Sequence, residues 1–363
     1  MTKKAPPTKG KNAKKRVSTR VTLAQVAAKS GVAVSTVSHI LNGRESCYAS
    51  KETRDRVAKS ARELGYRPNL AARALRGGAT YTLGIVTTAL DVEVCALKCM
   101  KFEQMARDNG YLAIMSFNPN NPETEDRLIM WLRDRSVDGI AVCPSETGDH
   151  EELKTLAREG FPVVTFDGAG ILDFDIDDVS VDYRHGGKLQ AEHLLEIDRR
   201  KACIANSAFS CFVVDERIES FSETMVDAGC DEPVRMNLKS EPNLPSSQLG
   251  VAMYEQLQSF LKQNRGKFDC LMASGDQYAL SAIRAAFSLG IRVPEELAIV
   301  SFDGTVGALN TPIQLSSVQH PCKEVGEAAF GLLSERMQQQ RKETRRLMIK
   351  PELIVRGSSV ASV

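Results

Sequence analysis

Short apolar runs alternate with helix-length amphipathic stretches from Tyr81 through Phe302 of this 363-residue chain. Most neighbouring runs are separated by a mixed charged and apolar pattern, as in Glu123 to Arg135 and Asp276 to Leu289. Such strand–helix alternation predicts parallel sheets that helices cover on both faces. The candidate strands are residues 82–87, 111–116, 137–143, 161–166, 201–205, 269–273 and 297–302.

The alternation starts again after Asp182, which predicts two similar Rossmann-like lobes with a cleft between them. In open parallel sheets, ligands bind beyond the carboxyl ends of the strands. Two carboxylates and an arginine in one cleft suit a polyhydroxylated or otherwise polar small molecule. An acid at a strand end can instead be a helix N-cap, and this is the preferred interpretation of Asp276. The polar residues that follow candidate strands are Thr88, Asp167, Arg217, Asp276 and Asp303.

The positive charge of the chain is concentrated at its N-terminal end. Residues 1–78 hold eighteen Lys and Arg but four acidic residues, a balance of +14, whereas the remaining 285 residues have a balance of −13. This division predicts a nucleic-acid-binding end joined to a domain with another role. Residues 1–19 are rich in Pro, Lys and Thr without apolar periodicity, so we expect a disordered basic tail.

A helical pattern begins abruptly at Thr22, a residue type that suits an N-cap. A first short helix with Val26 on its apolar side ends at Gly31, and a second carries Val37 on its apolar side. Two short helices joined by a glycine turn are the sequence form of a helix-turn-helix. Residues Lys51 to Leu64 are predicted to form a third helix with most of its charges outward.

Residues Val21 to Asn42, with the sequence VTLAQVAAKSGVAVSTVSHILN, resemble the DNA-binding headpiece of the LacI/GalR family of bacterial repressors. The resemblance continues through Thr53-Arg54, through LGYRPN at residues 64–69 and through AARAL at residues 71–75. In that family the second helix lies in the major groove, where side chains can read base edges. The segment 42–50 is longer than the common family loop.

The resemblance implies that Val34, Ser35 and His39 of the second helix read bases, with Thr36 and Ser38 near phosphate. Val34 offers an apolar face suited to a thymine methyl group, whereas Ser35 and His39 can donate or accept hydrogen bonds. Taken alone, His39 is more simply read as a solvent-facing helix residue. The full set of implied DNA-binding residues is Thr22, Val34, Ser35, Thr36, Ser38, His39, Asn42, Arg54, Asn69, Ala72 and Leu75.

Residues 68–79 are predicted to be a hinge and linker. Their run of strong helix formers is too short to be stable alone in water, and Gly77-Gly78 ends it. In the resembling family this hinge becomes helical on operator binding, and a leucine, here Leu75, enters the minor groove and bends the duplex. An ordinary linker with a helical bias is the alternative interpretation.

The chain from residue 80 onward resembles the effector domain of the same family, which is itself similar to periplasmic sugar-binding proteins. Matching segments include Ala273-Ser-Gly-Asp276, Ile291-Arg-Val-Pro294 and Val300-Ser-Phe-Asp303. The effector-binding residues that the resemblance implies are Thr88, Asp91, Asp167, Arg217, Gly275, Asp303 and His320.

Two departures from the family pattern bear on the effector. Ser220 stands where the family often has glycine, and residues 89–95 lack the aromatic side chains that often stack on sugar rings. The wall of the cleft is therefore expected to be aliphatic and acidic, with Asp91 or Glu93 near the ligand. A sugar or sugar derivative is the leading expectation for the ligand.

Other functional classes leave no sequence signal. No run approaches the roughly 18 apolar residues of a membrane span, and the polar N-terminus lacks a secretory signal. Nine scattered cysteines predict reduced, mostly buried thiols. There is no nucleophile elbow, phosphate-binding loop or spaced His/Cys set, so we expect no catalytic residue, metal or cofactor. The expected location is the cytoplasm, in association with the nucleoid.

The sequence thus predicts a small all-α helix-turn-helix headpiece at residues 20–67 and an α/β periplasmic-binding-protein-like effector domain of two Rossmann-like lobes at residues 80–363. We expect a homodimeric regulator, by family analogy a repressor, that binds near-palindromic double-stranded operator DNA and responds to a small polar effector. Two alternatives stay open: a periplasmic-type small-molecule binding protein, and a constitutive DNA-binding protein without effector response.

Overall fold

The computed structural model describes residues 21–41, 48–67, 79–90, 92–207, 211–239 and 246–361. The chain divides into two compact units, Met1–Gly78 and Ala79–Val363. Several predictions concern segments outside the described residues, namely the basic tail, most of the hinge, Asn42, Asn69, Ala72, Leu75 and Asp91.

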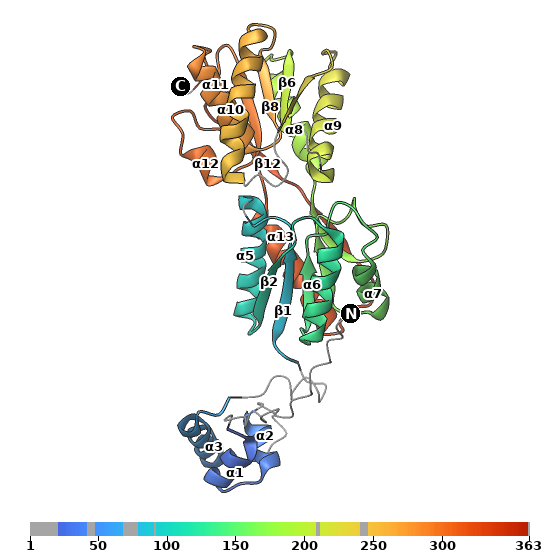
Figure 1. The fold of residues 1–363 in the computed structure, drawn as a ribbon, viewed down its shortest axis with the longest axis vertical. Coiled ribbons are helices and arrows are strands. Elements are labelled where there is room, and N and C mark those ends of the chain that lie inside the picture. The colour runs from blue at the N-terminus through green and yellow to red at the C-terminus, as the bar shows by residue number, and fades with distance from the viewer. Residues whose placement is uncertain are drawn as a thin grey trace, which may run out of the picture. The chain divides into compact units, whose positions relative to one another are not determined.

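The described residues of the small unit form three helices, α1 (Leu23–Ser30), α2 (Val34–Leu41) and α3 (Lys51–Leu64) (Figure 1). Thr22 caps α1 through a capping box with Gln25, in which each side chain bonds the other residue's backbone N–H. Gly31 ends α1 with a φ of 68°, a left-handed conformation that a residue with a Cβ rarely adopts. Val26 and Val37 are fully buried, so α1 and α2 pack against each other as a helix-turn-helix.

The first lobe of the large unit is a six-stranded, all-parallel sheet between helices (Figure 1). Its strands, in spatial order, are β11 (Arg346–Ile349), β5 (Asp177–Val181), β4 (Val163–Phe166), β3 (Gly139–Val142), β1 (Thr82–Thr87) and β2 (Leu112–Phe117). Its helices are α5 (Glu93–Asp108), α6 (Pro122–Asp134), α7 (Glu151–Glu159) and α13 (Cys322–Met337).

The second lobe repeats this plan with an antiparallel strand at one edge. Its strands, in spatial order, are β12 (Glu352–Ile354), β10 (Ser316–Gln319), β9 (Ala298–Asp303), β8 (Cys270–Ala273), β6 (Ala202–Ser207) and β7 (Val234–Leu238). Its helices are α8 (Tyr183–Glu196), α9 (Phe212–Asp227), α10 (Ser246–Gln263), α11 (Asp276–Ser288) and α12 (Val306–Leu309). The two lobes confirm the predicted fold class.

The central strand β1 shows why these strands are nearly continuous apolar runs. Leu83 and Ile85 belong to the hydrophobic cluster under α5 and α13, whereas Val86 belongs to the cluster on the opposite face of the sheet. A strand covered on both faces needs apolar residues at successive positions. The chain passes between the lobes three times, after β5, after β10 and between β11 and β12. The end of the chain therefore supplies parts of both lobes.

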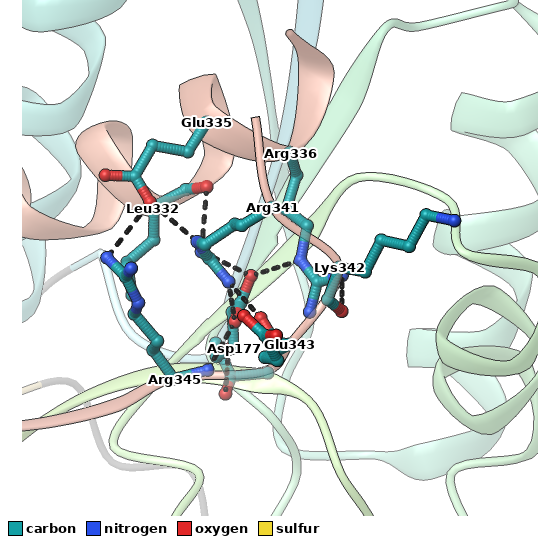
Figure 2. Close-up of polar contacts among 9 residues, drawn as sticks. Asp177, Leu332, Glu335, Arg336, Arg341, Lys342, Glu343 and Arg345 are labelled. Carbon is teal, nitrogen blue, oxygen red and sulfur yellow. Dashed lines mark hydrogen bonds and ion pairs between the residues drawn. The ribbon is translucent and has the colours of Figure 1, made fainter. Parts of the chain in front are cut away.

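A buried carboxylate holds the returning segment onto the first lobe (Figure 2). The Asp177 side chain is 0% exposed and accepts bonds of 2.8 Å from Arg336 and Arg341. The backbone N–H of Arg345, just before β11, donates to the same carboxylate at 2.7 Å. Burial raises the pKa of Asp177, but the bonds from Arg341 and Arg336 outweigh burial and leave the pKa below its ordinary value. The carboxylate is therefore ionised at neutral pH and fixes the start of β11.

We expect Asp177→Asn to destabilise the protein by about 3–5 kcal/mol at pH 7, because it removes the buried counter-charge of Arg336 and leaves Arg341 with the partly exposed Glu335. The stabilisation from a carboxyl whose pKa is lowered on folding is present above about pH 4 and is lost as pH falls through the lowered pKa. Urea unfolding measures both effects. The control is Glu335→Gln: Glu335 pairs with Arg341 but is 36% exposed, so its loss should cost about 1 kcal/mol or less. Equal losses in the two variants would contradict the assignment.

Candidate functional site

The second helix of the small unit presents polar side chains at its surface. Val34 is 46% exposed and Ser35 is exposed, whereas Thr36, Ser38 and His39 are half-buried. Val37, in the same helix, is fully buried and fixes which side of α2 faces outward. The helix thus offers an apolar group and hydroxyl and imidazole groups on an accessible surface, as the headpiece prediction requires.

The other DNA-binding candidates in the described small unit have structural roles as well. Thr22 caps α1, as described above, and is itself exposed. Arg54 is half-buried, and its Nε donates to the backbone carbonyl of Ala49 at 3.3 Å, just before α3 begins. Contact of these residues with DNA stays a prediction.

In the large unit, Arg217 and Asp303 meet in a buried site between strand ends. The Arg217 side chain, from α9, is 6% exposed and donates from Nη1 to Asp303 at 3.3 Å and to the Ser274 carbonyl at 2.8 Å. Its guanidinium lies 3.7 Å from the ring centre of Phe302 and 4.8 Å from that of Tyr183. As predicted, this arginine converges with one carboxylate. Two aromatic rings lie against its guanidinium group.

Asp303 has two features that are typical of functional positions. It is a non-glycine residue with a φ of 108°, a strained backbone conformation that clusters at binding and active sites. Burial raises the pKa of its carboxyl to about 7, an effect that the nearby charge of Arg217 only partly offsets. A Cβ at Gly275, the N-cap of α11, would lie 3.0 Å from a carboxylate oxygen of Asp303, so the glycine gives this carboxylate room.

Asp167 lies beyond β4, with a φ of 57°, and is paired differently from what the sequence suggested. One carboxylate oxygen accepts from Lys98 of α5 in a buried ion pair, and the other accepts from the backbone N–H of Val181 at 3.1 Å. Lys98 was not among the predicted site residues. The signal that could have found it is its spacing from Val94 and Phe102, which puts a lysine on the buried side of an amphipathic helix.

His320 joins the site from the segment that crosses between the lobes. It is 5% exposed, and its Nε2 lies 3.1 Å from the hydroxyl oxygen of Tyr183. Burial, together with the positive charges of Lys98 and Arg217, lowers the pKa of the imidazole well below its ordinary value, so it is neutral. Lys98, Arg217 and His320 therefore lie around Tyr183, where the two lobes meet.

The predicted N-cap role of Asp276 is wrong. Gly275 is the N-cap of α11, and the Asp276 side chain is 1% exposed. Its carboxylate accepts from the backbone and the hydroxyl of Thr305, at 2.6 and 2.8 Å, and from the Ser317 hydroxyl at 2.8 Å. The acid therefore fixes the loop after β9. Thr88 follows β1 as predicted and is half-buried.

Several contacts join the two lobes near this site. Glu146 of the first lobe accepts from the backbone N–H of Phe212 at the start of α9, at 3.0 Å. Glu93 likewise accepts from the N–H of Val306 at the start of α12, at 3.0 Å. The Phe212 ring lies directly against Gly170, where a Cβ would come within 1.8 Å of it. A pocket of about 910 Å³ reaches the site from the α5 side and is lined in part by Asp303 and His320.

A helix-turn-helix unit joined to a two-lobed unit with a buried polar site defines a bacterial regulatory protein. Residues 22–69 match the model of bacterial regulatory proteins of the lacI family, and residues 191–359 match the periplasmic binding protein-like domain. The chain thus combines a segment like the DNA-binding part of the lacI family with a periplasmic binding protein-like domain.

Two relatives and one solved structure are similar to this chain over most of its length. The HTH-type transcriptional repressor PurR of Proteus mirabilis is 27% identical over 338 residues, 93% of this chain and 96% of PurR. Catabolite control protein A of Staphylococcus epidermidis is 26% identical over 339 residues, 93% of this chain and 99% of that protein. The crystal structure of the Lac repressor dimer bound to operator and the anti-inducer ONPF has a TM-score of 0.81 and 21% identity, covering 94% of this chain and 100% of that chain.

Two features are absent from the described residues. None of their helices combines the length and the apolar character needed to cross a membrane. Nor do these residues contain a group of three or more His, Cys, Asp or Glu side chains arranged to hold a metal ion.

The raised pKa of Asp303 gives a testable dependence of stability on pH. Because the folded carboxyl binds a proton up to about pH 7 and the unfolded one only to about pH 4, wild-type stability should fall as pH rises through this window. Asp303→Asn, which resembles the protonated form, lacks this contribution. We expect the free energy of unfolding of the wild type, relative to the variant, to fall by roughly 1.4 kcal/mol per pH unit between pH 5 and 7. Urea unfolding measures this difference, and a difference that stays flat or grows with pH would contradict the assignment.

Proposed function

We propose that this chain is a transcription repressor that binds near-palindromic operator DNA as a homodimer and is controlled by a small polar effector bound between its lobes. The observation that carries the proposal is the combination, in one chain, of an accessible α2 surface in a helix-turn-helix and a site with two buried ion pairs at strand ends. Related proteins with both units are repressors.

In this proposal, α2 lies in the major groove, where Val34, Ser35 and His39 contact base edges. Thr22, Thr36, Ser38 and Arg54 contact the phosphate backbone, which sets the position of α2 but not the sequence read. Leu75 in the hinge enters the minor groove at the centre of the site. The basic N-terminal segment adds affinity for any duplex.

The effector site comprises Arg217, Asp303, His320 and the residues around them, and the ligand is a sugar or a sugar derivative. Charge-assisted hydrogen bonds from a buried arginine and carboxylates suit such a molecule. The ligand contacts both lobes, so it changes the angle between them and with it the affinity for operator, a coupling typically worth about 1–3 kcal/mol. The role is binding and not catalysis, and it needs no cofactor.

An exposed apolar surface of the first lobe supports the homodimer. Leu97 and Met100 of α5 are 40% and 61% exposed, and three side chains of the edge strand β2 are between 39% and 67% exposed. α5 packs on the face of the sheet to which Met115 and Phe117 point, whereas Leu112 points to the opposite face. Contiguous exposed apolar surface of this kind marks a protein interface. The three side chains of β2 are Leu112, Met115 and Phe117.

The first experiment on DNA binding selects duplexes from a randomised pool with the full chain and sequences the bound fraction. A near-palindromic sequence should be enriched. Binding without enrichment would contradict the repressor function and leave a basic arm that associates with any DNA. Enrichment that no small molecule changes would favour the constitutive DNA-binding alternative.

His39→Ala should weaken binding to the selected operator by roughly 5- to 150-fold, the range of one base contact of about 1–3 kcal/mol. Its affinity for a scrambled duplex should stay within about twofold, because a base contact adds nothing on random sequence. The control is Arg62→Ala, which removes a charge from α3 and should affect both duplexes equally. Fluorescence anisotropy measures all four affinities. An equal loss on both duplexes in His39→Ala would contradict a base-reading role.

Met100→Glu should convert the dimer to a monomer, because a carboxylate in an apolar interface loses its hydration without a partner. Analytical ultracentrifugation at micromolar concentration measures the mass. The matched control is Met130→Glu on α6, where the methionine is also exposed, at 45%, but lies outside this surface. A dimer that survives Met100→Glu would contradict this choice of interface.

A further inference from the structure

Lys98 is a nearly inaccessible lysine at the effector site. Its side chain is 3% exposed, and it lies on the side of α5 that also carries the buried Val94 and Phe102. Burial lowers the pKa of Lys98, but the charge of Asp167 together with Tyr183, Cys95 and Cys143 raises it by more, so the pKa lies well above its ordinary value. A permanent positive charge is thus held at the site.

The unused hydrogen-bonding atoms around Tyr183 are donors. A lysine ammonium has three N–H groups, and the contacts among the described residues give it one acceptor, Asp167. The Nε of Arg217 and the Nδ1 of His320 are buried and have no partner among the described residues. The 3.1 Å contact between the Tyr183 hydroxyl and Nε2 of His320 fits either neutral tautomer, and Nδ1 is a donor in the one where Nε2 accepts. Buried donors without acceptors are costly, so a ligand that supplies acceptors is favoured.

The two acids of the site already accept hydrogen bonds from the protein. Both carboxylate oxygens of Asp167 accept bonds from the protein, one from Lys98 and one from the backbone of Val181. Asp303 accepts from Arg217 and from the backbone N–H of Asp276. The carboxylates are thus already bonded to the protein, whereas the unpartnered N–H groups of Lys98 and Arg217 are donors. The site is matched to acceptor groups of the ligand.

We propose that Lys98 is a specificity-determining residue and that it selects an effector carrying an oxyanion, a carboxylate or a phosphate, on a small polar skeleton. The oxyanion accepts from Lys98 of the first lobe, from Arg217 of the second and from His320 between them, so it bridges the two lobes. This inference rests on the proposed effector role of the cleft.

The charges that face this position agree with an anionic group. Lys98 and Arg217 are both charged at neutral pH, whereas burial raises the pKa of Asp303 to about 7, so its carboxyl is only partly ionised. Glu93 and Glu146 are the acidic side chains bonded to the backbone N–H groups at the starts of α12 and α9, which offset their charge. Lys98 and Arg217 are each paired with an acid, so it is their unpartnered N–H groups, and not a net charge, that favour an anionic group.

The test compares neutral sugars with their acids. Glucose, galactose and mannose, their uronic acids and their 6-phosphates are each added to the full chain at constant ionic strength and pH 7, and the melting temperature is measured. We expect at least one acid to raise Tm by about 2 °C or more while its neutral parent does not. The uronic acid and the 6-phosphate separate a carboxylate from a phosphate. No shift with any acid, or an equal shift with its neutral parent, overturns the inference.

Variants then test Lys98 itself with the acid that binds. Lys98→Met should weaken binding of the acid by roughly tenfold or more, which corresponds to the loss of one charge-assisted hydrogen bond. Because this variant leaves Asp167 unpaired, the double variant Lys98→Met/Asp167→Asn removes both charges of the pair and should lose the same preference for acid over neutral sugar. The matched control is Lys154→Met, a half-buried lysine of α7, which should bind like the wild type. Retention of the preference in the double variant overturns the role of Lys98.

Operator binding by the same preparations separates this inference from the proposed function. Variants that bind operator normally but have lost the acid preference support the role of Lys98. A wild type that binds neutral sugars and operator refutes the oxyanion inference and leaves the repressor function intact. A wild type that selects no operator refutes the repressor function whatever the sugars do.

Discussion

Burying an ionised side chain requires a counter-charge, because an unpaired charge costs several kcal/mol in the protein interior. The large unit meets this requirement with ion pairs that join segments far apart in the sequence. The pair at β5 ties the end of the chain to the first lobe, and the pairs at the cleft tie helices to strand ends within each lobe. Neither the returning strand nor the polar site could keep its place if one partner were lost. The pairs are Asp177 with Arg341, Lys98 with Asp167, and Arg217 with Asp303.

The apolar strands were predictable from the sequence, and the polar or exposed ones were not. The seven candidate strands correspond to β1, β2, β3, β4, β6, β8 and β9 within a few residues. β10 was not predicted because its sequence, Ser-Ser-Val-Gln, is mostly polar. Ser316 is nevertheless fully buried, since its backbone N–H and hydroxyl form hydrogen bonds with Ser358 and Arg356 near the end of the chain. β11 escaped because it is an edge strand with three exposed residues. Tertiary hydrogen bonds and edge positions leave no local periodicity to read.

The candidate sites divide in the same way. Strand ends pointed to Asp167, Arg217 and Asp303, since a parallel sheet gathers these ends at one edge. The sequence does not predict the partner of each acid, because the partner depends on which helix packs over that edge of the sheet. Lys98 was not predicted to belong to the site, and Asp276 was interpreted as a helix cap. In the small unit, the helix boundaries and the buried Val37 follow directly from local pattern, because short helices and a glycine turn are local structures.

The carboxylates of Glu93 and Glu146 have a consequence for how this molecule can respond to a signal. Each spans the lobes with a single hydrogen bond from a charged acceptor to a helix N-terminus, an interaction worth about 1.5–3 kcal/mol. Contacts of that size cost little to break, so a form with the lobes further apart would lie close in free energy to the closed one. A ligand needs only a modest difference in affinity between the two forms to reverse their populations. Glu93 and Glu146 therefore stabilise the closed form only weakly. A small molecule that binds one form better can determine which form is more populated.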